Sequence, residues 1–211
     1  MEKKKRGRPV QPAEKKEKIR QNIINVAKKL FADEGYEHIS IRKIANQAGC
    51  VPRTIYYYFK NKRELLNHLW IDIFTSVSDF CEKEAAGIDE PVGLIKIYYK
   101  AYINYWLNNH DHYRVIFMNE DLNANKTHDK LVFEMISANA AVIGIMEEAI
   151  QKCIENGTFA KKRKDIIFQM FLLSAHGLSS GLITMREIEW KASEELIATT
   201  LDALLSGILE K

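Results

Sequence analysis

Apolar positions recur at three- and four-residue intervals along most of the chain. The first two series are Ile19, Ile23, Ala27, Leu30 and Phe31, then Leu65, Leu66, Leu69, Ile73, Phe74 and Val77. This spacing places apolar side chains on one face of an α-helix, and no segment sustains the period-two alternation of a strand. Pro91 is the last of four prolines, so the final 120 residues contain no helix breaker of that kind. The pattern predicts an all-α fold.

Glycine, proline and capping residues predict where the helices begin and end. Gly35 and Gly49 are expected to end helices in the left-handed conformation, Ser40 and Asn61 to cap helix N-termini, and Pro52 to occupy a first helical position. The predicted helices cover residues 12–34, 40–49, 52–59, 61 to the low 80s, 90–108, 110–120, 126–156, 162–186 and 190–209. No internal repeat is visible.

Residues 40–59 combine two short helices with a tight glycine turn, which is helix-turn-helix geometry. We expect Ala45 to allow a close helix crossing and Gly49 to supply the turn. The inward side chains are expected to be Ile41, Ile44, Ala45, Ala48, Ile55 and Phe59, and the outward ones Arg53, Thr54, Tyr56, Tyr57 and Tyr58. Because the first residues of a recognition helix reach base edges, Arg53 is the candidate for a bidentate contact to guanine. The alternative is a solvated helix pair, which three outward tyrosines disfavour.

Three motifs carry a wider resemblance. They are Leu30-Phe31-x-x-x-Gly35-Tyr36, Ser40-Ile41-x-x-Ile44-Ala45-x-x-Ala48-Gly49 and Thr54-Ile55-Tyr56-Tyr57-Tyr58-Phe59-Lys60-Asn61-Lys62-x-x-Leu65-Leu66. The stretch from Ile19 to Trp70 that contains them closely resembles the TetR family of bacterial transcriptional regulators. The resemblance implies a nine-helix, Ω-shaped homodimer that binds a palindromic DNA operator and releases it when a small-molecule effector enters the C-terminal domain. It implies no cofactor.

Position by position, the resemblance implies DNA contacts from Arg42, Pro52, Arg53, Thr54, Tyr56, Tyr58 and Lys62. We expect the tyrosines, Lys62 and Arg42 to hold phosphates, while Arg53 and Thr54 read bases. The chain departs from the family at Val51, where a serine N-cap is usual, and at Cys50, where a valine is common. Loss of the capping hydroxyl costs about 0.5–2 kcal/mol and one phosphate contact.

Charge is divided unevenly along the chain. Residues 1–68 hold 17 Lys and Arg against 7 Asp and Glu, whereas residues 69–211 hold 14 against 21. This asymmetry indicates that the first segment meets a polyanion. Its basic start includes Arg6-Gly7-Arg8-Pro9, which resembles the core of an AT-hook, so Arg6 and Arg8 are candidates for the minor groove. A disordered basic tail that attracts phosphates nonspecifically is an equally good interpretation.

We therefore expect a basic arm over residues 1–11, a DNA-binding domain over 12–62 and a ligand-binding and dimerisation domain over 63–211. Aromatic and methionine side chains of the last part suggest a pocket for an apolar or aromatic effector, with Tyr102, Trp106, Phe117 and His176 as lining candidates. Small residues followed by an aliphatic stripe suggest a dimer interface. Its candidates are Ser174, Gly177, Gly181, Ile197, Leu201 and Leu204. The alternatives are an ordinary packed core and an intramolecular hairpin.

Other function classes are disfavoured. No apolar run approaches a membrane span and no signal peptide is visible, so a cytoplasmic protein is expected. Cys50, Cys81 and Cys153 are too far apart for a disulfide framework, and His110-Asp111-His112 lacks metal-ligand spacing. No nucleophile–base pair supports an enzyme. A TetR-like activator or coactivator that responds to a protein partner remains the main alternative to a repressor.

Overall fold

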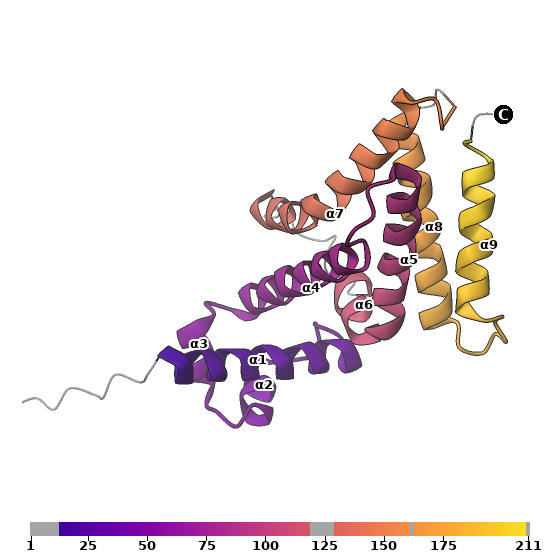
Figure 1. The fold of residues 1–211 in the computed structure, drawn as a ribbon. Coiled ribbons are helices and arrows are strands. Elements are labelled where there is room, and N and C mark those ends of the chain that lie inside the picture. Colours follow the sequence, from indigo (N-terminus) through magenta and orange to yellow (C-terminus); the bar gives the residue numbers. More distant parts are fainter. Residues whose placement is uncertain (1–12, 119–128, 161–162, 210–211) are drawn as a thin grey trace, which may run out of the picture. The chain divides into compact units, whose positions relative to one another are not determined.

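The computed structural model describes residues 13–118, 129–160 and 163–209, with only the backbone described over 129–141 (Figure 1). In this part of the chain the elements are α1 (Ala13–Glu34), α2 (Ile41–Gln47), α3 (Pro52–Tyr58), α4 (Lys62–Glu84), α5 (Pro91–Asn108), α6 (His110–Phe117), α7 (Asp129–Glu155), α8 (Lys164–Thr184) and α9 (Ser193–Ser206). Each lies within a few residues of a predicted helix. The predicted all-α class is confirmed.

The chain divides into two compact units, one ending at Leu69 and the other beginning at Trp70. In the first unit, α1 contacts both α2 and α3, and α2 contacts α3. The core of this unit is formed by side chains that are at most 5% exposed, among them Ile23, Ala27, Phe31, Ile44, Ala45, Ile55, Phe59, Leu65 and Leu66. Ile41 and Ala48, predicted to be inside, are only half-buried because they lie at the ends of the short α2.

Local signals set the helix ends of the first unit. The Ser40 hydroxyl accepts a hydrogen bond from the Lys43 backbone N–H at 3.1 Å, and Asn61 Oδ1 accepts one from the Glu64 N–H at 2.8 Å. The predicted left-handed turns are present, since φ is +81° at Gly35 and +68° at Gly49. These contacts satisfy backbone groups that a helix end leaves unpaired.

In the second unit α5 is the central helix, because it contacts α6, α7, α8 and α9. Its buried side chains are Ile95, Tyr98, Tyr99, Ala101, Ile103, Tyr105 and Trp106. The Phe159 and Leu209 backbones pair as an isolated antiparallel bridge that joins the end of α7 to the end of α9. Aromatic rings therefore occupy the middle of this unit.

The sequence analysis predicted that no segment is long and apolar enough to span a membrane, and α8 shows that this prediction was wrong. The 21 residues of α8 contain an 18-residue window with a mean hydropathy of 1.6, which passes that test by length and composition. In the structure α8 contacts α5, α7 and α9, and it buries Ile167, Phe171, Ala175 and Ile183. These contacts account for the buried apolar side chains of α8, but only 28% of its most apolar window is buried, and Leu172 and Leu173 remain 39% and 69% exposed.

Candidate nucleic-acid interface and ligand pocket

The turn between α2 and α3 is held by backbone groups. The Cys50 N–H donates to the Ala45 carbonyl at 2.9 Å, and the Gly49 N–H donates to the Asn46 carbonyl at 3.2 Å. From α1, the Asn22 side-chain amide donates to the Ala48 carbonyl at 3.0 Å. Together with the fully buried Ala45 at the crossing, these bonds fix the angle between α2 and α3. The pair forms a rigid helix-turn-helix motif.

One face of α3 is packed and the other is exposed. Ile55 and Phe59 are 0% and 1% exposed, whereas Tyr56 and Tyr57 are 54% and 67% exposed. Arg53 is exposed beside them. The other predicted DNA-contact residues of the motif are also accessible: Arg42 and Pro52 are exposed, and Thr54 and Tyr58 are half-buried. The surface offers two guanidinium groups, those of Arg42 and Arg53, and several hydroxyl groups to a ligand outside the unit.

An open groove of about 510 Å³ lies between the beginnings of α2 and α3. Its lining residues are Ser40, Arg42, Lys43, Asn46, Cys50, Val51 and Pro52. Two of these carry positive charge and none carries negative charge. The Lys43 ammonium is ion-paired with Glu34, so the Arg42 guanidinium is the main feature that suits the groove to an anionic group such as a phosphate. Val51, the N-cap of α3, contributes no side-chain hydrogen bond, as the sequence predicted.

Lys62 lies at the first turn of α4, where its ammonium is held by Tyr36. Lys62 Nζ donates to the Tyr36 carbonyl at 2.8 Å and lies 4.0 Å from the centre of the Tyr36 ring. An ammonium has three N–H donors, so this contact positions Lys62 and leaves donors for a phosphate.

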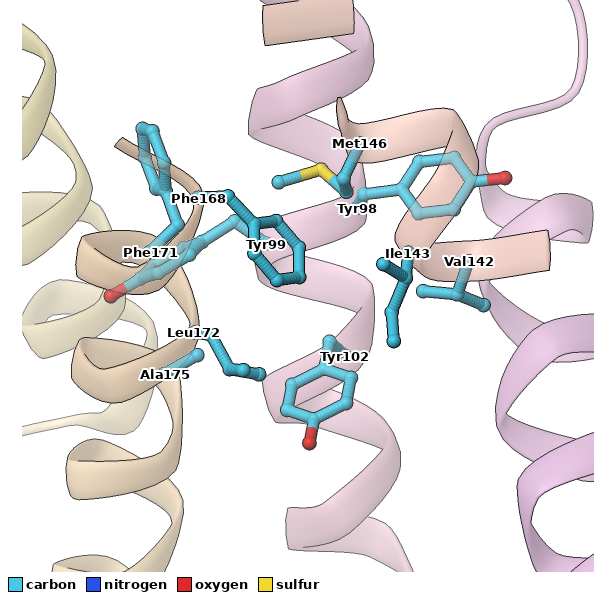
Figure 2. Close-up of a pocket in the computed structure, with 10 residues that line it drawn as sticks. All are labelled: Tyr98, Tyr99, Tyr102, Val142, Ile143, Met146, Phe168, Phe171, Leu172 and Ala175. Atoms are coloured by element: carbon cyan, nitrogen blue, oxygen red, sulfur yellow. The ribbon is translucent and has the colours of Figure 1, made fainter. Parts of the chain in front are cut away.

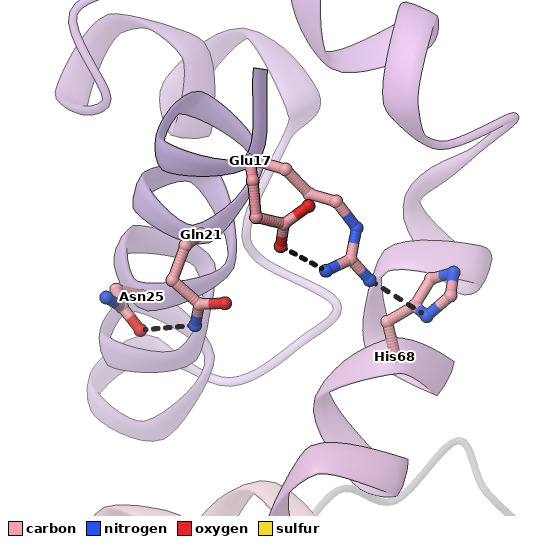
Figure 3. A network of polar contacts seen from close by, with 5 residues as sticks. Glu17, Gln21, Asn25 and His68 are labelled. Carbon is pink, nitrogen blue, oxygen red and sulfur yellow. Dashed lines mark hydrogen bonds and ion pairs between the residues drawn. The ribbon is translucent and has the colours of Figure 1, made fainter. Parts of the chain in front are cut away.

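The sequence did not indicate a polar network centred on Arg20 (Figure 3). The Arg20 guanidinium donates to Glu17 Oε1 at 3.2 Å, lies 3.4 Å from His68 Nδ1, and covers the Phe59 ring at 5.8 Å. The network joins α1 to the part of α4 that belongs to the first unit. Only the Glu17 contact, three residues away on the same helix, could have been found from spacing.

A partly open cavity of about 80 Å³ lies between α5, α7 and α8 of the second unit (Figure 2). Its lining residues are Tyr98, Tyr99, Tyr102, Val142, Ile143, Met146, Phe168, Phe171, Leu172 and Ala175. None of these described residues is charged, and their polar side-chain groups are three tyrosine hydroxyls. The Tyr99 hydroxyl lies 2.9 Å from Ser174 Oγ. An apolar wall with few polar groups is typical of small-molecule sites.

Of the four pocket candidates, Tyr102 lines this cavity, and Trp106, Phe117 and His176 form an aromatic cluster next to it. Trp106 contacts Tyr102 and Phe117 with ring centroids 5.8 and 5.3 Å apart, and Phe117 contacts His176 at 4.7 Å. Tyr113, which was not a candidate, stacks on His176 at 5.6 Å. The cluster therefore continues from the Tyr102 end of the cavity.

Burial keeps the polar groups of this region uncharged. It raises the pKa of Tyr102 to about 12 and lowers the pKa of His176. The cause is the same in both residues, since a low-dielectric environment disfavours the charged form, which is phenolate for tyrosine and imidazolium for histidine. At neutral pH the Tyr102 hydroxyl is therefore a hydrogen-bond donor and His176 is neutral.

The six dimer-interface candidates lie in different surroundings. Ile197 and Leu201 are 3% and 2% exposed, so they are already buried within one copy of the unit. Ser174 is hydrogen-bonded to Tyr99, and a methyl group added at Gly181 would lie 3.8 Å from the Trp190 ring. Gly177 is exposed and Leu204 half-buried. Larger exposed apolar side chains of this region are Leu173, Met185, Ile188 and Trp190.

The three cysteines are free thiols. Burial raises the pKa of Cys81 to about 12 and of Cys153 to about 11, and it also raises the pKa of Cys50. A raised pKa keeps each thiol protonated and unreactive. Within residues 13–118, 129–160 and 163–209, no group of three metal-ligating side chains is found. The arm with Arg6 and Arg8 lies outside the described residues.

Comparisons with known proteins agree with this geometry. Residues 23–69, which contain the helix-turn-helix motif, match the family model for the N-terminal domain of "Bacterial regulatory proteins, tetR family". Residues 23–69 are a TetR-family DNA-binding domain. The match covers the DNA-binding segment, which includes the capped α2, the glycine turn and the exposed face of α3.

Curated relatives are similar in sequence to part of this chain, and solved structures are similar to it in fold. The fatty acid metabolism regulator protein of Bacillus subtilis is 38% identical over 68 residues, which is 32% of this chain and 34% of that protein. The first curated relatives are matched over 25–46% of their own length. A TetR family transcription regulator of Marinobacter aquaeolei shares the fold, with a TM-score of 0.75 at 15% identity, over 95% of this chain and all of the other. The fatty acid degradation regulator FadR of Bacillus halodurans gives 0.72 at 19%, over 95% of this chain and 98% of FadR.

Proposed function

We propose that this TetR-family protein is a dimeric, sequence-specific transcriptional repressor that a small apolar effector releases from a palindromic DNA operator. The observation that carries the proposal is the exposed face of α3, where Arg53 and two largely exposed tyrosines lie on a helix fixed by the buried Ala45 crossing. Side chains at the start of such a helix can reach base edges in the major groove. The nearby groove with Arg42 and Lys43 suits the phosphate backbone.

The roles within the motif follow from these positions. Arg53 and Thr54 read base edges, while Tyr56, Tyr58, Arg42 and Lys62 bind phosphates. The arm with Arg6 and Arg8 adds attraction to DNA, either in the minor groove or along the backbone. Together with the positive charge of residues 1–68, these groups give the protein affinity for DNA of any sequence, and Arg53 supplies the discrimination.

The dimer forms through the exposed apolar surface of the α8–α9 region. Leu173 is 69% exposed, and Met185, Ile188 and Trp190 are 53%, 47% and 42% exposed. Apolar surface of this kind on one unit favours association with a second copy. A two-fold dimer carries two recognition helices and therefore reads an inverted repeat. The expected result of sedimentation analysis is a dimer that Leu173→Glu converts into a monomer.

The effector occupies the cavity between α5, α7 and α8. Two relatives are named for the regulation of fatty acid metabolism and degradation, which is consistent with an apolar metabolite as the signal. A ligand that binds more tightly to the DNA-free form must weaken operator binding by the same factor. The protein then acts in the cytoplasm, where DNA and metabolite meet. A decrease in promoter activity after gene deletion would instead indicate an activator.

The decisive experiment is selection of duplexes from a random pool by the full chain, followed by sequencing and by affinity measurements at several salt concentrations. An enriched inverted repeat is expected. Arg53→Ala should lose the preference for that repeat, at a cost of about 1–3 kcal/mol, and keep a similar salt dependence. Lys29→Ala is the matched control, because it removes the same charge from an exposed position of α1 outside the motif. Enrichment of A/T content alone, unchanged by Arg53→Ala, would refute the proposal.

A further inference from the structure

The turn that follows α1 holds two lysine side chains in different ways. The Lys43 ammonium of α2 is ion-paired with the Glu34 carboxylate, which compensates its positive charge. The Lys62 ammonium of α4 donates to the Tyr36 carbonyl at 2.8 Å and lies 4.0 Å from the centre of the Tyr36 ring. Among the described residues these are the contacts of the Lys62 ammonium, and neither group carries a formal charge. Lys62 is therefore held in place without losing its charge to a carboxylate.

Gly35 determines where the Tyr36 side chain lies. Its φ of +81° ends α1 and turns the chain back, and its N–H donates to the Phe31 carbonyl at 3.1 Å. The Tyr36 ring then packs edge to face on the Phe31 ring, with centroids 5.2 Å apart, and Tyr36 is only 9% exposed. The Tyr36 carbonyl also accepts a hydrogen bond from the Ile39 N–H at 3.3 Å. Both groups that contact Lys62 are therefore fixed by the core of the first unit.

The backbone of Lys62 is fixed as well. Asn61 Oδ1 accepts a hydrogen bond from the Glu64 N–H at 2.8 Å, which caps α4 and makes Lys62 its first residue. Leu65 and Leu66 of the next residues are 0% exposed, so this end of α4 is packed into the core. Tyr36 and Lys62 are 26 positions apart in the sequence. The flexible part between the two anchored backbones is the lysine side chain, and the Tyr36 contacts hold its end.

Holding the end of a lysine side chain favours the binding of an anion. A free lysine side chain populates many rotamers, and ordering it on a ligand costs conformational free energy. Contacts that exist before binding reduce this cost. The ring face attracts the ammonium through its quadrupole and supplies no competing negative charge. Of the three N–H donors of the ammonium the Tyr36 carbonyl takes one, so donors remain for phosphate oxygens.

We propose that Tyr36 is a positioning residue of the DNA-binding unit, whose ring and backbone carbonyl present the Lys62 ammonium to a phosphate of the DNA backbone. This inference rests on the proposed function, because it names what positions one phosphate contact of the proposed DNA interface. Tyr36 acts through Lys62 and needs no contact with DNA of its own, which agrees with its burial. Every residue at position 36 keeps the carbonyl, so the ring is the part that a substitution can remove.

The test measures the Kd of the full chain for fluorescently labelled DNA duplexes by anisotropy, between about 50 and 200 mM salt. One duplex carries the inverted repeat enriched from the random pool, and the other is a scrambled sequence of the same length and composition. Lys62→Ala should weaken binding to both and reduce the slope of log K against log salt by about 0.9 for each bound copy of the unit. Lys29→Ala, which removes the same charge from an exposed position of α1, is the control and should change the slope less.

Tyr36→Leu removes the ring and keeps the lysine. It should raise the Kd of both duplexes about threefold, because Lys62 must then be ordered on binding, and it should leave the salt slope nearly unchanged, because the charge remains. Tyr36→Phe keeps the ring and should recover most of the affinity that Tyr36→Leu loses. In the Lys62→Ala background Tyr36→Leu should have no further effect, since the side chain that it positions is absent. Circular dichroism and thermal unfolding verify that each variant is folded at the assay temperature.

Three outcomes would overturn the inference. They are an equal rise of Kd on Tyr36→Leu with and without Lys62, an affinity of Tyr36→Phe as low as that of Tyr36→Leu, and an effect of Lys62→Ala no larger than that of Lys29→Ala. The first would show that the ring has only a structural role.

The proposed function is tested separately by enrichment of the inverted repeat. If no repeat is enriched, the proposed function fails, and the same variants still decide the inference on the scrambled duplex, because a phosphate contact does not depend on base sequence. If the repeat is enriched but the effect of Tyr36→Leu does not depend on Lys62, the inference fails and the regulator remains.

Discussion

A serine at position 51 is expected to stabilise the first unit. Val51 is the N-cap of α3, with φ −96° and ψ 153°, and it makes no side-chain hydrogen bond. These angles are the extended ones that a capping serine adopts, so a serine hydroxyl can accept from the N–H of Arg53 or Thr54 without a change of backbone. Val51 is 62% exposed, so little buried apolar surface is lost when it is replaced.

The size of the expected stabilisation follows from the free energies of N-capping measured in other helices. A serine N-cap is worth about 0.5–2 kcal/mol relative to alanine, with about 1 kcal/mol typical. For a unit of 60–100 residues, 1 kcal/mol raises Tm by about 4–8 °C, and if the whole chain unfolds in one transition the shift is about 2–4 °C. Val51→Ser is therefore expected to melt several degrees above Val51→Ala.

The assay is thermal unfolding of the full chain, followed by circular dichroism for Val51→Ser, Val51→Ala and Ser40→Ala. Ser40→Ala is the internal standard, because it removes a cap that the structure contains, the bond from the Lys43 N–H at 3.1 Å. It should lower stability by about 0.5–2 kcal/mol. If Ser40→Ala destabilises the protein while Val51→Ser and Val51→Ala melt together, the reasoning that α3 lacks an N-cap is refuted.

Three further predictions concern glycine, packing and pH. Gly49→Ala should destabilise the first unit by about 1 kcal/mol or more because φ at this residue is +68°. Gly144→Ala should stabilise the protein by about 0.5–1 kcal/mol, because Gly144 lies in α7 and nothing lies within 4 Å of the added carbon. Chemical denaturation measures both free energies of unfolding, and a loss of stability in both variants would contradict the argument from φ. Ala45→Leu should cost about 1–3 kcal/mol and loosen the helix-turn-helix motif, since Ala45 is fully buried at the helix crossing, and an unchanged melting curve would show that the crossing has spare room. Burial lowers the folded-state pKa of His176, so the unfolded state binds a proton at this residue first as pH falls. The stability that comes from the neutral histidine is complete above about pH 6.5 and is lost below it. Denaturation at pH 7.5 and 5.5 should therefore show a smaller loss of stability in His176→Gln than in the unmodified protein.

The sequence by itself determined the parts of this protein that depend on local interactions. Helix ends at Gly35, Ser40 and Gly49 follow from backbone angles and capping bonds among neighbouring residues, and they could be predicted within a few positions. The all-α class follows from periodicity alone. The helix-turn-helix motif and the family could be predicted because the inward and outward positions of residues 40–59 are set by two short helices and one turn.

Only the tertiary structure decided which partners the remaining side chains meet. Periodicity shows that a helix has an apolar face, but it does not say which neighbour covers that face. Tyr102 and Trp106 are one turn apart on α5, yet one lines the cavity and the other is enclosed in an aromatic cluster. The Arg20–His68 contact joins residues 48 positions apart. Three packed neighbours likewise decided which apolar side chains of α8 are buried, because burial depends on contacts between helices that are distant in the chain.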